Sequence, residues 1–378
     1  MNYTKLLHSL CAIVFIVFTF AYLFFFQADL LAMEQHVLSN GTTTYNRTIG
    51  SLVILAVLYL LQIGAYKLTK FDGIFYSLTY IPSFLLLALL TNVDGNFDTT
   101  TSFGSILFVL PIMLFFYTFF AIAYKRNITF FKHIQSNLYV ARSLFLNLIV
   151  LIIIFLFTCY FGNTDKVLHY RLHMEALLKS GDTAEALATA SQCDTTDASL
   201  TMLRAYALAK EGHLGEKLFE YPLYGSSEAL LPNGNSTKTM LISPDVIYNQ
   251  LSFRKRGKMT AIQYLKYIDA NGLAKRSGAD YLLCAYLLDK NLDAFVSEIM
   301  KHYNITSPTL PKHYKEALIL YTHLKLNPVI VYHSEVLDAD YADFQKIMRK
   351  YNDLTIRAAY VRDSYETTYW YYYFYNIV

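Results

Sequence analysis

The segment that follows the first apolar run contains residue types that can carry out acid–base or metal chemistry. It reads QADLLAMEQHVLSNG and places Asp29, Glu34 and His36 close together in the sequence. A carboxylate in such a loop can bind a metal ion or act as a general base. We therefore take these three residues as candidates for catalysis at a membrane surface. The alternative interpretation is an amphipathic turn at the interface whose acidic residues face water.

This loop is similar to the first outer loop of membrane glycosyltransferases that use polyprenyl-phosphate sugars, where acidic residues also occur. The similarity implies a transferase that acts on a lipid-linked sugar. The loop departs from that pattern because it has no pair of adjacent acids. Those enzymes also usually have more membrane spans than this sequence predicts. The transferase is therefore the alternative function, with Asp29, Glu34 and His36 as its residues.

Other patterns in the sequence do not predict an active site. His169 and His173 in HYRLH share a helix face, but a metal site needs a third ligand and none is evident. The sequence contains no GxSxG, Walker A, HExxH or CxxC motif. Cys193 and Cys284 lie at apolar helical positions, which favours buried free thiols over a disulfide. We expect neither a metal nor a cofactor.

The sequence YWYYYFY, from Tyr369 to Tyr375, ends the chain but for a few residues. It can cap the last helices, lie at the bilayer interface where Tyr and Trp are favoured, or bind a partner. We prefer the cap because local packing needs no partner. The candidate residues for capping or partner binding are Tyr369, Trp370, Tyr371 and Tyr372. The pattern fits a short strand or a final helix equally well.

Composition divides the chain into two parts. Of its 378 residues 54% are hydrophobic and only 16% are charged, against about 25% charged in soluble domains. Apolar residues concentrate in residues 1–162, which predicts a transmembrane domain followed by a helical domain over residues 163–378. Five runs are long enough to cross a bilayer as helices: about 6–26, 48–66, 74–91, 104–124 and 142–161.

Basic residues in the short loops predict the orientation of these spans. They lie at the N-terminus and in alternate loops, at Lys5, Lys67, Lys70, Lys125, Arg126 and Lys132, whereas the other loops hold only Arg47. We expect a cytoplasmic N-terminus and a domain over 163–378 outside the cytoplasm, with the lipid bilayer as one partner. No charged residue lies in the middle of a span, which disfavours an ion pump or a proton-coupled transporter and favours an anchor. A net charge of +3 gives no indication of nucleic-acid binding.

Beyond residue 163 the pattern is one of short amphipathic helices that turn at Gly181, Gly212, Gly257 and Asn291. The last two turns are 34 residues apart, which is the tetratricopeptide period. The sequence thus predicts an all-α protein with a transmembrane helix bundle of five spans and a tetratricopeptide-like solenoid. A generic helical array is the alternative. Such solenoids usually hold a peptide or protein, although a spacer with no partner is also consistent with the pattern.

Four stretches, QADLLAMEQHVLSNG, ALAKEGHLGEKLFEYP, LPKHYKEALILY and TYWYYYF, resemble an uncharacterised family of bacterial membrane proteins, a domain of unknown function. Its members combine N-terminal membrane helices with a tetratricopeptide-like C-terminal region. The resemblance implies a cell-envelope location and supplies no activity. Taken with the loop charges, it leads us to expect a bacterial inner-membrane protein with a periplasmic C-terminal domain. We expect a protein that binds or scaffolds another envelope protein.

Overall fold

The computed structural model describes residues 3–96, 106–127, 140–254 and 259–376. Within these ranges the chain is helical or irregular and contains no β-strand, so the all-α prediction is confirmed. The chain forms two compact units, Met1–His169 and Tyr170–Val378. Lys132 and Gly257, which supported the predicted orientation and repeat period, lie outside the described residues.

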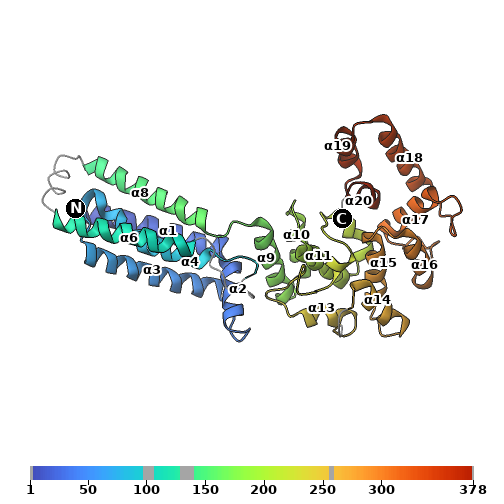
Figure 1. The fold of residues 1–378 in the computed structure, drawn as a ribbon, viewed down its shortest axis with the longest axis horizontal. Coiled ribbons are helices and arrows are strands. Elements are labelled where there is room, and N and C mark those ends of the chain that lie inside the picture. Colours follow the sequence, from blue (N-terminus) through green and yellow to red (C-terminus); the bar gives the residue numbers. More distant parts are fainter. Residues whose placement is uncertain (1–2, 97–105, 128–139, 255–258, 377–378) are drawn as a thin grey trace. The chain divides into compact units, whose positions relative to one another are not determined.

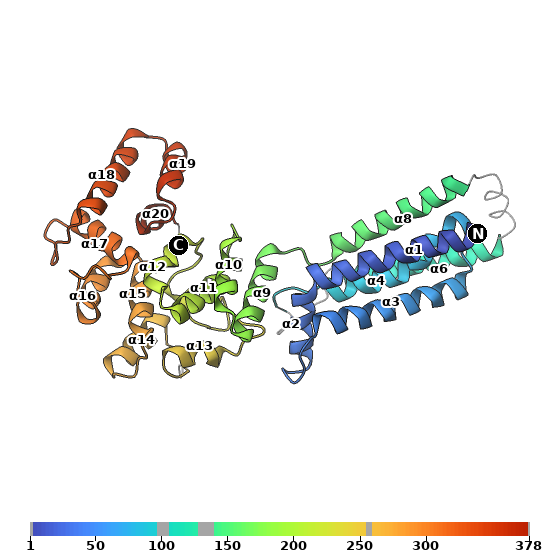
Figure 2. The ribbon, with the colours of Figure 1, turned by 180° about the vertical axis from the view of Figure 1, so that it is seen from behind.

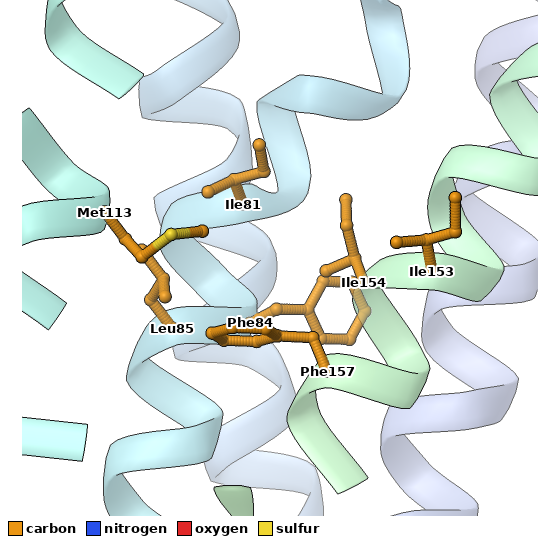
Figure 3. Close-up of a pocket in the computed structure, with 7 residues that line it drawn as sticks. All are labelled: Ile81, Phe84, Leu85, Met113, Ile153, Ile154 and Phe157. Carbon is orange, nitrogen blue, oxygen red and sulfur yellow. The ribbon is translucent and has the colours of Figure 1, made fainter. Parts of the chain in front are cut away.

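The first unit contains five helices that are long and apolar enough to cross a membrane. Their central parts lie side by side in both views of the structure (Figures 1 and 2). Helix α2, Ala28–Leu38, connects the first of these helices to the second. The spans are α1 (Tyr3–Ala21) with a π-helical turn (Tyr22–Phe26), α3 (Arg47–Thr69), a 3-10 segment (Gly73–Tyr80) with α4 (Ile81–Thr91), α6 (Ile106–Arg126) and α8 (Val140–Phe161).

The third span is irregular. Its first part is a 3-10 helix, and Pro82 lies in the first turn of α4. Asn147 of α8 is completely buried against this part. Its side chain accepts from the Ser77 N–H at 2.7 Å and donates to the Gly73 carbonyl at 2.8 Å. Asn147 thus satisfies backbone groups that could not find water in a bilayer.

The second unit is built from short helices connected by tight turns. Helix α9 begins in the first unit and continues in the second. The helices are α9 (Lys166–Ser180), α10 (Thr183–Ser191), α11 (Ala198–Glu211), α12 (Leu214–Lys217), α13 (Pro244–Leu251), α14 (Ala261–Ala270), α15 (Gly278–Leu288), α16 (Leu292–His302), α17 (Lys312–Leu324), α18 (Glu335–Lys350), α19 (Leu354–Tyr365) and α20 (Tyr369–Tyr375).

Glycine and capping residues set the turns of this unit where the sequence predicts them. Gly181 and Gly212 have positive φ values of 90° and 75°, a conformation that glycine adopts without a Cβ penalty. Asp182 and Asn291 accept backbone N–H groups at the starts of α10 and α16. Helix α15 packs against both α14 and α16. The tetratricopeptide register itself stays a prediction.

Buried charged side chains hold the irregular segments of the second unit. Arg204 of α11 is fully buried, and its guanidinium donates to the carbonyls of Ala190, Cys193 and Pro222. The Glu175 carboxylate is also fully buried and accepts three consecutive backbone N–H groups, at Met240, Leu241 and Ile242. Burial raises the pKa of Glu175, while these N–H donors and Arg171 oppose the shift.

Candidate functional site

Helix α2 carries the three acid–base candidates, and its periodicity separates them. At about 100° per residue, Asp29 and His36 lie about 20° apart around the helix axis, while Glu34 lies about 140° from Asp29. Glu34 is buried, whereas Asp29 and His36 are half-buried. The His36 ring lies across Gly41, whose added Cβ would come within 3.2 Å of it. The helix therefore does not direct the three side chains to one point.

Glu34 lies on the apolar face of α2 with Leu30, Leu31 and Met33. Its side chain is 8% exposed, and its Oε1 atom has no hydrogen-bond partner among the described residues. Burial raises the pKa of the Glu34 carboxyl to about 8. The neighbouring Tyr45 phenol has a raised pKa, first from burial and also from Glu34. Glu34 is thus a carboxyl that stays protonated near neutral pH.

The aromatic C-terminal segment forms helix α20 and packs into the largest core of the second unit. Tyr369, Trp370 and Tyr372 are buried, and Tyr371 is half-buried. The phenol groups of Tyr369 and Tyr372 donate to the carbonyls of Leu287 and Leu288, at 3.1 and 2.9 Å. These carbonyls lie at the C-terminal end of α15, and that of Leu287 also accepts the Lys290 N–H at 3.1 Å. The tyrosines therefore bury aromatic area and complete the end of another helix.

Glu316 of α17 connects helix α20 to the rest of the unit. Its buried carboxylate accepts the Tyr369 N–H at 2.7 Å and lies 2.9 Å from His313 Nδ1. Its backbone carbonyl accepts the Trp370 indole N–H at 2.8 Å. Phe219 packs edge-on against Tyr369 and Tyr372. The structure therefore gives the segment a helical form and an internal location.

The segment between α17 and α18, residues 325–334, exposes apolar side chains, which sequence reasoning missed. Leu326 is 100% exposed, Val329 78% and Val331 56%. Ile330 and Tyr332 instead pack against the core, so the exposed and half-buried positions alternate. The run of four apolar residues after Pro328, Val329–Tyr332, was the available signal.

Sequence reasoning also missed one group of possible metal ligands. Asp269, Glu298 and His302 place a donor atom each within 4.8 Å of one another. Asp269 is distant in sequence from Glu298 and His302, so no local sequence motif predicts the group. The HYRLH histidines are not part of it, and His169 Nε2 instead lies 3.0 Å from the Asn163 carbonyl. None of the four cysteines forms a disulfide.

Together these features define an all-α protein with five helices of membrane-spanning length and a helical C-terminal unit. The chain belongs to a family of unknown function, DUF6057, whose family model matches residues 100–255 and 261–376. No curated protein and no solved structure matches it. The predicted family resemblance is therefore confirmed, while the family itself supplies no activity.

We expect Glu34→Gln to change the pH dependence of stability. A carboxyl whose pKa is about 8 when folded and about 4.5 when unfolded binds more protons in the folded state between these values. The wild-type protein should thus lose stability as pH rises from about 4.5 to 8, and the variant, which mimics the protonated form, should lose less. Thermal unfolding in detergent across this range measures the difference. Asp29→Asn is the matched control, and equal pH profiles for the wild-type and Glu34→Gln proteins would contradict the assignment.

We expect Trp370→Ala to lower the melting temperature of the C-terminal unit strongly. The indole is 1% exposed and hydrogen-bonded, and removing a buried Trp costs about 3–5 kcal/mol. For a unit of about 200 residues this corresponds to a decrease of at least about 6 °C. Phe374→Ala, in the same helix but 39% exposed, should have a smaller effect. Equal decreases for the two variants would exclude a specific capping role.

Proposed function

We propose that this protein is an envelope membrane protein whose C-terminal unit binds a partner protein through the exposed apolar segment 325–334. The single observation that carries the proposal is the exposure of Leu326, Val329 and Val331. Exposed apolar side chains that lie close together can form part of an interaction site. The proposal places the N-terminus in the cytoplasm and residues 163–378 in the periplasm of a bacterium, on the basis of the loop charges.

The base of the exposed segment is held in place, which favours a recognition surface over a loose loop. The Val329 N–H donates to the Tyr321 hydroxyl at 3.4 Å, and the Tyr332 N–H donates to Thr322 Oγ1 at 3.1 Å. At its end, the Ser334 N–H donates to Asp338 at 3.0 Å. A segment that is ordered before binding loses less conformational entropy when a partner docks. We therefore propose a partner with a complementary apolar surface.

Photo-crosslinking in the native membrane tests this surface directly. A photoreactive residue at Val329 should give one discrete protein adduct, because that side chain would lie in the interface. The same residue at the exposed Lys210 of α11 should give none. Adding Leu326→Asp should abolish the Val329 adduct, since a buried unpaired charge opposes docking. An absence of protein adducts at Val329, or adducts with lipid alone, would refute the proposal.

A transferase acting on a lipid-linked sugar is the second candidate, and Glu34 is the observation that favours it. A carboxyl with a pKa of about 8 is protonated at neutral pH and can act as a general acid. Asp29 and His36 lie on another face of α2, so Glu34 would need other partners. The buried position of Glu34 at the outer end of the first span supports this candidate only in part.

Native mass spectrometry of the gently extracted protein distinguishes the two functions. The binding function predicts a stoichiometric protein that stays with the chain and is lost from Leu326→Asp. The transferase predicts a bound polyprenyl-phosphate lipid and no protein, with turnover abolished in Glu34→Gln. A chain that carries neither species from its own membrane would count against both functions.

A further inference from the structure

The side chains of Asp269, Glu298 and His302 form a compact group in the C-terminal unit. Asp269 lies near the end of α14, and Glu298 and His302 lie one turn apart near the end of α16. Both helices pack against α15. The Glu298 side chain is 10% exposed, and those of Asp269 and His302 are each 21% exposed. Three donors from two helices thus meet in a largely buried location.

The distances from His302 to the two carboxylates are longer than those of most N–H···O hydrogen bonds. His302 Nε2 lies 3.4 Å from Asp269 Oδ1 and 3.6 Å from Glu298 Oε1, whereas N–H···O bonds measure about 2.7–3.2 Å. The Nε2 atom is buried and has no hydrogen-bond partner in the part of the chain that the structure describes. This imidazole nitrogen, which faces two carboxylates, is therefore available to coordinate an ion.

The same distances fit ligands around one ion. Four ligands about 2.1 Å from a tetrahedral Zn²⁺ are separated by about 3.4 Å, which is close to both measured separations. One imidazole nitrogen and two carboxylate oxygens also suit Zn²⁺ better than Ca²⁺, which takes about six to eight oxygens. Three protein ligands leave the fourth position for water.

Lys301 is a positively charged neighbour that competes with a metal ion for the Glu298 carboxylate. Its ammonium lies 2.9 Å from Glu298 Oε1. The Lys301 side chain is 60% exposed, so it can move into water when an ion takes its place. The two carboxylates would then balance the two charges of the ion, with His302 neutral. Without an ion, Lys301 and a protonated His302 would balance the same carboxylates.

We propose that Asp269, Glu298 and His302 bind one Zn²⁺ ion, which ties α14 to α16 across α15. The site is independent of the exposed segment 325–334 and does not depend on the proposed partner. Zn²⁺ binding at this site would stabilise the fold, because an ion that binds the folded unit and not the unfolded chain raises the melting temperature.

Metal titration of the chelator-treated full chain in detergent tests the site. We expect one Zn²⁺ per chain by equilibrium dialysis and elemental analysis, together with a rise in melting temperature. Co²⁺ in its place should give the visible absorption of a tetrahedral site. His302→Gln and Asp269→Asn should each weaken Zn²⁺ binding by about tenfold or more, since loss of even an outer-shell partner costs about tenfold.

His213→Gln is the matched control, because His213 is exposed and lies in the same unit. That variant should bind Zn²⁺ as the wild type does. Asp269→Asn keeps the proposal testable if His302→Gln fails to fold, as judged by circular dichroism. Stoichiometric binding that both site variants leave unchanged, or no Zn²⁺ binding by the wild type, would overturn the proposal in favour of a protonated His302 between two carboxylates.

Discussion

Buried backbone groups need hydrogen-bond partners, and both units of this protein depend on how that need is met. The third membrane-spanning segment shows the requirement most clearly, because its 3-10 portion does not satisfy all of its own groups. Asn147 of α8 reaches the Ser77 N–H and the Gly73 carbonyl. One buried amide thus pairs with two groups of an irregular backbone and links α8 to that segment.

The C-terminal unit meets the same requirement with larger side chains. Short helices leave many free ends, and here tyrosine phenols, the Arg204 guanidinium and the Glu175 carboxylate supply the missing partners. Glu175 alone binds three successive amides of the segment before α13. This explains how residues 218–243, which contain few helical turns, still contribute to the core. In this unit the buried side chains that pack the core therefore also supply hydrogen bonds to backbone groups.

Features that depend on residues close together in the sequence could be predicted, whereas features that depend on contacts between distant residues could not. Long apolar runs and turn-forming residues such as Gly212 act locally, so five spans and several turns could be predicted. Whether Tyr369–Tyr375 is a strand or a helix depends on Glu316, Leu287 and Leu288, which are distant in sequence. The partners of Asn147, Gly73 and Ser77, are also distant from it in sequence. The Asp269, Glu298 and His302 group likewise has no local motif.

Side-chain atoms that already form hydrogen bonds within the fold are less available for catalysis or ligand binding, which limits the residues that can carry a function. One carboxylate oxygen each of Glu175 and Glu316 accepts backbone amides, and the terminal nitrogens of Arg204 donate to carbonyls. Several buried polar atoms in the described parts of the chain have no hydrogen-bond partner, among them Glu34 Oε1 and His302 Nε2, and segment 325–334 exposes apolar side chains. Burial with no partner costs free energy, and so does apolar exposure to water. Both costs fall when a ligand or partner binds, so Glu34, His302 and segment 325–334 are places at which function can be tested.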